Sequence, residues 1–330
     1  MKRATILAGL FALSIGATPL GSVPAAADQP PLYITVVKST GFNWFKRMET
    51  GVKEFGKKND INAVQVGPSK PDSAMQLQSL EDAIAQKPKA IAVVPLEVAA
   101  LEPALAKAKE RGIIVITHEA ADAKNASYDV EAFDNAAYGR HLMDELAKRM
   151  NEEGQYAVFV GSLTQTTHNA WVDAAIAQQK EKYPKMELVG TKNESHDDVA
   201  KAYQITKDLL KTYPKLKGIQ GSDALDVVGA GQAVEEAGLR GKVAIVGTSI
   251  PSYAGDLVKS GTIGLITAWD PALAGEAMNT VAKLISEGKT VKTGDNLGVP
   301  GYENVNVVGD VIYGSAWLDM DPKNIDQYKF

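Results

Sequence analysis

Short apolar segments alternate with amphipathic ones along most of this chain. Residues 32–37 (LYITVV) and 90–94 (AIAVV) are nearly continuous apolar runs, which are typical of strands buried on both faces. Residues 42–58 instead place Phe45, Met48 and Val52 on one face of a helix. By the same criteria, strands are predicted at 61–66, 113–117, 128–130, 156–160, 187–190, 216–220, 243–246, 263–267 and 305–308, and helices at 72–86, 99–111, 135–150, 169–182, 197–212, 225–237, 252–260 and 272–287.

This alternation predicts an α/β fold in which parallel sheets carry helices on both faces. Right-handed crossovers would make each sheet part of a doubly wound layer. The alternation of strands and helices is interrupted at 151–154 (NEEG) and then begins again. A single open sheet seldom has more than about ten strands, which is roughly the number predicted here. We therefore expect two doubly wound parallel-sheet lobes joined by a hinge.

The predicted boundaries follow from the restart of the pattern. Residues 28–134 form the expected N-terminal lobe, with 271–304 crossing back to it, and 135–270 form the C-terminal lobe. Residues 305–330 are expected to make a last crossover and a tail. The hinge is predicted at crossovers near Phe133, Trp269 and Asn304.

Composition narrows the function classes. The 330 residues are 45% hydrophobic and 23% charged, which fits a folded globular chain. The net charge of −5 gives no basic footprint for nucleic acid or for an anionic membrane. Cysteine is absent, which excludes thiol catalysis, disulfides and iron–sulfur ligation.

The first 27 residues have the three parts of an export signal. Lys2 and Arg3 precede an apolar run at 4–17, and Ala25 and Ala27 form an A-x-A cleavage pattern. Cleavage is predicted after Ala27, so that the mature chain works outside the cytoplasm. A weak membrane anchor or a disordered N-terminus is the alternative. A lipid-anchored start is not expected, because no cysteine follows the apolar run.

The candidate site comes from the position of polar and aromatic residues after the strands. Ligands of open α/β sheets bind at the carboxyl ends of the strands. Aromatic faces pack on the C–H faces of a sugar, and carboxylates, amides and a lysine satisfy its hydroxyls. This residue mixture favours a carbohydrate site. The predicted ligand-binding residues are Lys38, Phe42, Asn43, Trp44, Phe45, Glu119, His168, Asn169, His196, Asp223, Thr248, Trp269 and Asp270.

Structural roles compete for several of these positions. Trp44 and Phe45 could begin a core-facing helix, Glu119 could be a solvated loop acid, and Lys38 could lie on the surface. His168 and His196 could be ordinary loop histidines, and no i, i+4 histidine pair supports a metal site. Trp171 is expected in a helix core. We predict no metal and no cofactor.

The order of these motifs resembles the periplasmic sugar-binding proteins of bacterial ABC importers, of the ribose-binding type, from about residue 33 to 330. Within that group it is most similar to the autoinducer-2-binding and rhamnose-binding branch. The resemblance implies the two-lobed fold of type I periplasmic binding proteins. It is carried by the segments 37–45 (VKSTGFNWF), 116–119 (ITHE), 223–224 (DA), 267–270 (TAWD), 297–301 (LGVPG) and 324–330 (NIDQYKF).

The resemblance also implies roles for these residues. Trp44 and Phe45 would stack on the ligand ring, and Lys38 would donate to a ligand oxygen. Glu119, where the family usually has Asp, would accept from a pair of hydroxyls. The segment with Asp223 would reach the ligand, and Trp269 and Asp270 would sit at the pocket edge.

Two departures bear on the ligand. Thr167 and His168 replace an Asp-Gln pair of the autoinducer-2 binders, and Ser222 replaces a Pro. These departures favour a pentose, hexose, deoxysugar, amino sugar or polyol. An amino sugar is suggested by the excess of acids over Lys38, which counts Glu119, Asp223, Asp270 and Asp198.

The predicted function is capture of a small carbohydrate in the periplasm and its delivery to an ABC permease in the inner membrane, by a monomer. One alternative is a signalling receptor for a sugar-like molecule such as autoinducer-2, which would dock to a chemoreceptor. The other is an exported carbohydrate-active enzyme that uses Glu119 with Asp223 or Asp270 as an acid–base pair. Compaction of the chain on ligand binding is expected in all binding roles.

Overall fold

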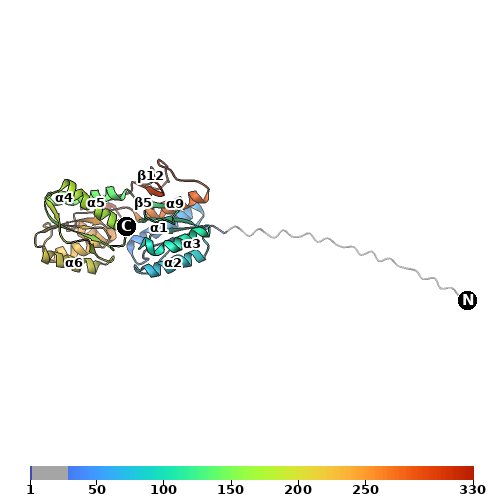
Figure 1. Ribbon diagram of the computed structural model, residues 1–330, viewed down its shortest axis with the longest axis horizontal. Helices are drawn as coiled ribbons and strands as arrows, with labels where there is room; N and C mark the ends of the chain where they lie inside the picture. The colour runs from blue at the N-terminus through green and yellow to red at the C-terminus, as the bar shows by residue number, and fades with distance from the viewer. Residues whose placement is uncertain (2–28) are drawn as a thin grey trace.

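The computed structural model of the chain describes residues 29–330, together with Met1 (Figure 1). The predicted leader and its cleavage site after Ala27 fall on residues 2–28, which lie outside the described part of the chain. Among the helices that are described, none combines the length and the apolar character that crossing a bilayer requires.

The first lobe, here the N-lobe, is built on a seven-stranded sheet with the order β12-β13-β5-β4-β3-β1-β2. Neighbouring strands are parallel except for the antiparallel pair β12 and β13. Its strands are β1 (Leu32–Val36), β2 (Asn62–Val66), β3 (Ala90–Val93), β4 (Ile114–Thr117), β5 (Tyr128–Glu131), β12 (Asn306–Val308) and β13 (Val311–Tyr313).

The second lobe, here the C-lobe, is built on a separate sheet with the order β14-β11-β10-β9-β6-β7, in which β8 also pairs with β6. Only the pair β11 and β14 is antiparallel within this described sheet. Its strands are β6 (Gly154–Val160), β7 (Met186–Leu188), β8 (Asn193–Glu194), β9 (Leu216–Gly221), β10 (Ala244–Thr248), β11 (Leu265–Ala268) and β14 (Leu318–Met320).

Helices cover both faces of each sheet, so each lobe has three layers (Figure 1). Helices α1 and α9 pack together on one face of the N-lobe sheet, and α2 and α3 pack together on the other. In the C-lobe, α4 packs with α5, and α7 packs with α6 and α8. The helices are α1 (Asn43–Asn59), α2 (Ser73–Ala85), α3 (Val98–Glu110), α4 (Asn135–Met150), α5 (Thr166–Lys182), α6 (Val199–Thr212), α7 (Asp226–Glu236), α8 (Pro251–Lys259), α9 (Pro271–Ser286) and the short 3₁₀ helix η1 (Ile325–Gln327).

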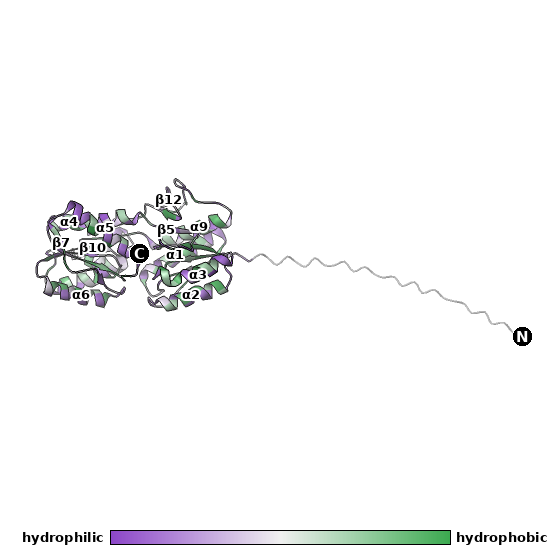
Figure 2. Ribbon diagram, viewed as in Figure 1, coloured by the Kyte–Doolittle hydropathy of each residue, from purple (hydrophilic) through white to green (hydrophobic). Residues whose placement is uncertain are grey.

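The fold class predicted from the sequence is confirmed, and each predicted strand and helix occurs to within three residues. Helix α1 illustrates why: Met48, Val52 and Phe55 lie on one buried face, while the lysines at its end face solvent. Figure 2 shows the same division in the other helices, with apolar faces toward the sheets and polar faces outward. Gly51 is required in this helix, since a Cβ there would lie 1.9 Å from the carbonyl oxygen of Ala272 in α9.

The chain crosses between the lobes three times, and an aromatic cluster joins the three crossovers. Phe133, in the first crossover, stacks on Tyr138 with ring centroids 4.1 Å apart. It also contacts Trp269 at the second crossover and Trp317 at the third, at 5.3 and 5.6 Å. The third crossover therefore lies between β13 and β14, not near Asn304 as predicted, because residues 306–313 still pair within the N-lobe sheet.

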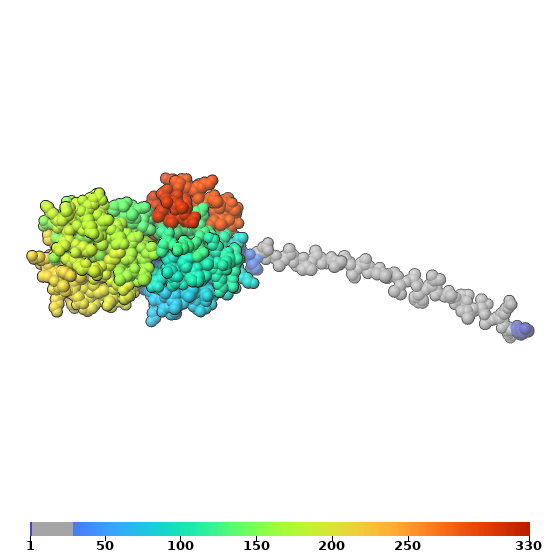
Figure 3. All heavy atoms as spheres, in the orientation of Figure 1, coloured from blue at the N-terminus to red at the C-terminus, as the bar shows by residue number. Residues whose placement is uncertain are grey.

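The two lobes are in direct contact along their shared boundary (Figure 3). Hydrogen bonds cross the cleft: Asn43 N–H donates to the Tyr253 hydroxyl at 2.5 Å, and Thr164 and Thr166 of the C-lobe donate to Glu97 and Asp122 of the N-lobe at 3.0 and 3.1 Å. The structure is therefore a closed arrangement of the lobes.

Candidate ligand-binding site

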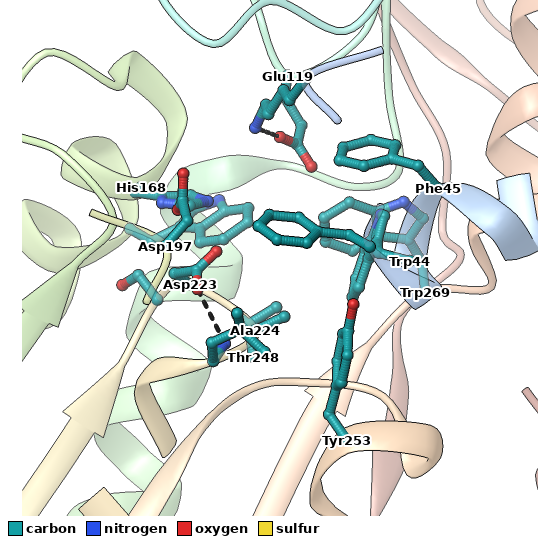
Figure 4. A pocket seen from close by; sticks show the side chains of 15 residues that line it. Trp44, Phe45, Glu119, His168, Asp197, Asp223, Ala224, Thr248, Tyr253 and Trp269 are labelled. Atoms are coloured by element: carbon teal, nitrogen blue, oxygen red, sulfur yellow. Dashed lines mark hydrogen bonds and ion pairs between the residues drawn. The ribbon is translucent and has the colours of Figure 1, made fainter. Parts of the chain in front are cut away.

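A cavity lies between the lobes, at the carboxyl ends of strands from both sheets (Figure 4). The lining residues are Lys38, Phe42, Trp44, Phe45 and Glu119 of the N-lobe, His168, Trp171, Asp197, Ser222, Asp223, Ala224, Leu225, Thr248 and Tyr253 of the C-lobe, and Trp269 at the second crossover.

An ion pair closes one end of the cavity. Lys38 follows β1, Glu119 follows β4, and each is 8% exposed, with the Lys38 ammonium donating to Glu119 Oε2. Burial alone would raise the pKa of Glu119, but the charge of Lys38 and its hydrogen bond help to hold that pKa below its usual value. Burial would likewise lower the pKa of Lys38, and the neighbouring carboxylates raise it instead. Both groups are therefore charged and bound to each other.

Aromatic rings form the wall on the N-lobe side. Trp44 lies against Trp269 edge to face, with centroids 4.8 Å apart, and both side chains are almost fully buried. Phe42 caps the start of α1 in an extended conformation, which aims the first residues of the helix toward the cleft. Figure 4 shows the rings of Trp44, Phe45 and Trp269 grouped on one side of the cavity, opposite His168, Asp197 and Asp223. Such faces suit the C–H surface of a ring or chain of carbons.

Acidic and polar side chains form the opposite wall. Asp197 accepts from the Gln165 amide at 3.1 Å, and Asp223 accepts from the Leu225 backbone N–H at 2.8 Å. Burial, followed by the charge of Asp197, raises the pKa of Asp223 well above its usual value. His168 accepts from the Gly161 N–H at 3.3 Å through Nδ1, and burial lowers its pKa to about 4, so its imidazole is neutral.

Two of the cavity acids stand on strained backbone. Glu119 has φ of +58° and Asp197 has φ of +53°, both in the left-handed region that residues with a Cβ seldom adopt. Such conformations persist where the surrounding structure fixes them, and they gather at functional sites. In this backbone conformation, Glu119 of the N-lobe and Asp197 of the C-lobe both line the same cavity.

The structure places nine of the thirteen predicted site residues in the cavity lining: Lys38, Phe42, Trp44, Phe45, Glu119, His168, Asp223, Thr248 and Trp269. Their contact with a ligand remains a prediction. Thr248 shares a hydrogen bond of 2.9 Å with the buried Tyr138 hydroxyl, so its position is fixed by the core.

The other four predicted residues lie outside the lining, and each has a different role. Asn43 faces Lys46 at the start of α1, and Asn169 binds backbone carbonyls and Lys192 from within α5. The His196 side chain is 62% exposed beside Glu194. Asp270 caps α9, with its carboxylate 2.9 Å from Ala272 N, and binds Arg47 at 2.6 Å.

Six lining residues were not predicted as ligand contacts: Trp171, Asp197, Ser222, Ala224, Leu225 and Tyr253. Five of them lie in or beside segments that follow strands, so the strand-end rule points to their neighbourhood. Trp171 is both a core residue, as expected, and a wall of the cavity.

One group of potential metal ligands occurs in the cavity. His168, Asp197 and Asp223 each offer a ligand atom, and these atoms lie within 4.8 Å of one another. The same geometry suits any small cationic group, since two carboxylates converge there.

Comparison with known proteins agrees with this architecture. Residues 33–290 match the model of a family described as the periplasmic binding protein domain. The D-allose-binding periplasmic protein of Escherichia coli (strain K12) is 28% identical over 249 residues, which cover 73% of this chain and 79% of that protein. The xylitol-binding protein of Mycolicibacterium smegmatis is 26% identical over 307 residues, covering 91% and 84%.

A solved structure shows the same fold. An ABC transporter solute-binding protein from Clostridium phytofermentas, with bound L-rhamnose, superposes with a TM-score of 0.81 at 23% identity, covering 91% of this chain and 98% of that one. With the two lobes, the cleft between them and the family match over 33–290, the chain belongs to the periplasmic binding protein domain family.

Proposed function

We propose that this chain is a solute-binding protein that closes around a small carbohydrate or polyol and delivers it to an ABC permease. The observation that carries the proposal is the composition of the interlobe cavity: aromatic rings on one wall, and acids and hydroxyls on the other. Named relatives that bind D-allose and xylitol, and a similar structure with bound L-rhamnose, support this ligand class.

Two buried polar atoms of the lining support a polar ligand. The Trp269 indole N–H and the Ser222 hydroxyl have no hydrogen-bond partner among the described residues. Buried polar groups are normally paired, and an unpaired one costs on the order of 1–3 kcal/mol. A ligand hydroxyl can act as donor or acceptor, so it satisfies either group.

Two of the three acids that a glycosidase could use here are engaged elsewhere. An acid–base pair needs one carboxyl group that holds a proton at the leaving oxygen. Glu119 is instead bound to Lys38, which keeps its pKa low, and Asp270 is a helix cap outside the cavity. The geometry therefore favours binding over hydrolysis. We further propose export of the mature chain to the periplasm, where it would meet the permease as a monomer.

The test is a thermal-shift screen of mature protein against pentoses, hexoses, deoxysugars and polyols, followed by calorimetry on the compounds that stabilise it. We expect at least one compound to bind, and Trp44→Leu to weaken it by about tenfold or more through lost stacking area. His196→Asn is the matched control, because that side chain is exposed outside the cavity. Failure of the whole panel to bind, or conversion of the bound sugar to a product, would contradict the proposal.

A further inference from the structure

The C-lobe end of the cavity holds two carboxylates that form no ion pair with a lysine or arginine among the described residues. Asp197 and Asp223 have oxygens within 4.8 Å of each other and of a His168 nitrogen. Among the lining residues, all of which lie in the described part of the chain, Lys38 is the only one with a cationic side chain at neutral pH, and it is bound to Glu119. Figure 4 shows Asp197 and Asp223 side by side, away from Glu119.

The charges of the lining therefore do not balance. Lys38 and Glu119 cancel each other, and His168 is neutral because its Nδ1 accepts the Gly161 N–H. Asp197 and Asp223 remain as an excess of up to two negative charges. Two like charges held this close repel each other, and a cation between them relieves that repulsion.

A third carboxyl group, that of Asp226, lies next to the pair and adds to the acidic character of this end of the cavity. Asp226 is fully buried, and its Oδ2 accepts from the backbone N–H groups of Ser222 and Asp223 at 3.1 and 2.8 Å. When ionised, Asp226 adds its negative charge to that of Asp197 near Asp223. No lysine or arginine of the described C-lobe lines this end of the cavity.

A second, independent observation indicates that the ligand reaches this end. The Ser222 hydroxyl is fully buried, lies in the cavity lining next to Asp223, and has no hydrogen-bond partner among the residues that the structure describes. An ammonium group fits this environment, because it donates three hydrogen bonds and carries the missing charge.

We propose that the ligand carries an ammonium group that binds between Asp197 and Asp223 and contacts Ser222, so that the preferred ligand class is the amino sugars. This inference rests on the proposed function and names its substrate class. A neutral sugar brings no charge to the two carboxylates, whereas an amino sugar brings an ammonium group that both can accept from.

The experiment is calorimetry of the mature protein at neutral pH with D-glucosamine, D-galactosamine and D-mannosamine, each compared with D-glucose, D-galactose or D-mannose. EDTA is present, so that a divalent cation does not occupy the His168–Asp197–Asp223 group. We expect at least one amino sugar to bind about tenfold or more tightly than its neutral counterpart, the effect of a charge-assisted hydrogen bond.

Two substitutions locate the effect. Asp223→Asn is expected to abolish the preference for the amine over its neutral counterpart. Asp198→Asn is the matched control: it removes one charge from the adjacent acid of the same loop, but Asp198 is exposed and caps α6, a role that Asn also fills. We expect Asp198→Asn to leave the preference unchanged.

The outcomes separate this inference from the proposed function. Neutral sugars that bind as tightly as their amino counterparts, or more tightly, would overturn the inference and leave the carbohydrate function intact. An equal loss of amine preference in Asp198→Asn would also overturn it, because a general field effect would then explain the result. No binding by any amino sugar or by any neutral compound of the wider panel would overturn both.

Discussion

Closure of the lobes depends on a contact that can be removed without changing the shape of the cavity. Tyr253 lies on α8 of the C-lobe, and its hydroxyl accepts the N–H of Asn43, the first residue of α1 in the N-lobe, at 2.5 Å. The first N–H groups of a helix have no partner within the helix, so this contact satisfies a group that otherwise needs water. Tyr253→Phe keeps the ring in the cavity lining and removes only the hydroxyl.

The size of the effect follows from that single hydrogen bond. A half-buried neutral hydrogen bond contributes about 0.5–1.5 kcal/mol, which corresponds to a factor of about 2–13 in an equilibrium constant. The bond joins the two lobes, so it forms only on closure. Closure and ligand binding are coupled, and the dissociation constant should therefore rise by this factor in Tyr253→Phe, with the thermal stability of the ligand-free protein nearly unchanged.

The assay is calorimetry with the tightest sugar of the panel, together with small-angle scattering with and without that sugar. Tyr183→Phe is the matched control, because its hydroxyl donates to Asp144 at 2.8 Å within the C-lobe. That variant should lose stability and keep its affinity. An unchanged dissociation constant in Tyr253→Phe, or an equal loss of affinity in Tyr183→Phe, would refute the coupling of this contact to closure.

Three further outcomes are expected. Gly51→Ala should destabilise the fold by about 1–3 kcal/mol in urea unfolding because its Cβ meets the α9 backbone, whereas Gly255→Ala, in α8 with open space around it, should be neutral or slightly stabilising. Lys38→Met should destabilise by about 3–5 kcal/mol because it leaves Glu119 buried without its partner, and adding Glu119→Gln should recover most of that loss. Burial raises the pKa of Asp226 to about 7, so the folded state holds a proton that the unfolded state loses near pH 4; stability should fall as pH rises between these values, and less steeply in Asp226→Asn.

Much of the fold was predictable because its signals are local. Buried parallel strands such as β1 and β3 are continuous apolar runs, and α1 repeats its apolar residues at helical spacing. Strands β8, β13 and β14 have two or three residues each, with partly exposed side chains and no periodicity to detect. The third crossover lies between β13 and β14, and because these strands could not be detected, the crossover was predicted too early, near Asn304.

The strand-end rule found most of the cavity but not the roles of individual polar residues. Asp270 precedes Pro271 at the start of α9, which is the pattern of a capping residue before a first-turn proline, and this signal competes with ligand contact. Asn169 was placed at the start of a helix, but α5 begins three residues earlier, at Thr166, which turns Asn169 onto the backbone of the preceding loop. Boundary errors of this size are enough to move a side chain out of a site.

The acids near β8 show what only the structure could supply. His196 and Asp197 are consecutive and both adopt the left-handed conformation, yet His196 faces solvent and Asp197 lines the cavity. A sequence gives the residue types of such a loop but not the direction of each side chain. The cavity is acidic, as the sequence led us to expect, but partly through different residues. Asp198 and Asp270 cap helices, and Asp197 lines the cavity beside Asp223. The sequence indicated only that several acids lie near the site, whereas the structure shows two carboxylates facing the same point. That is the geometry that a bound ammonium group requires.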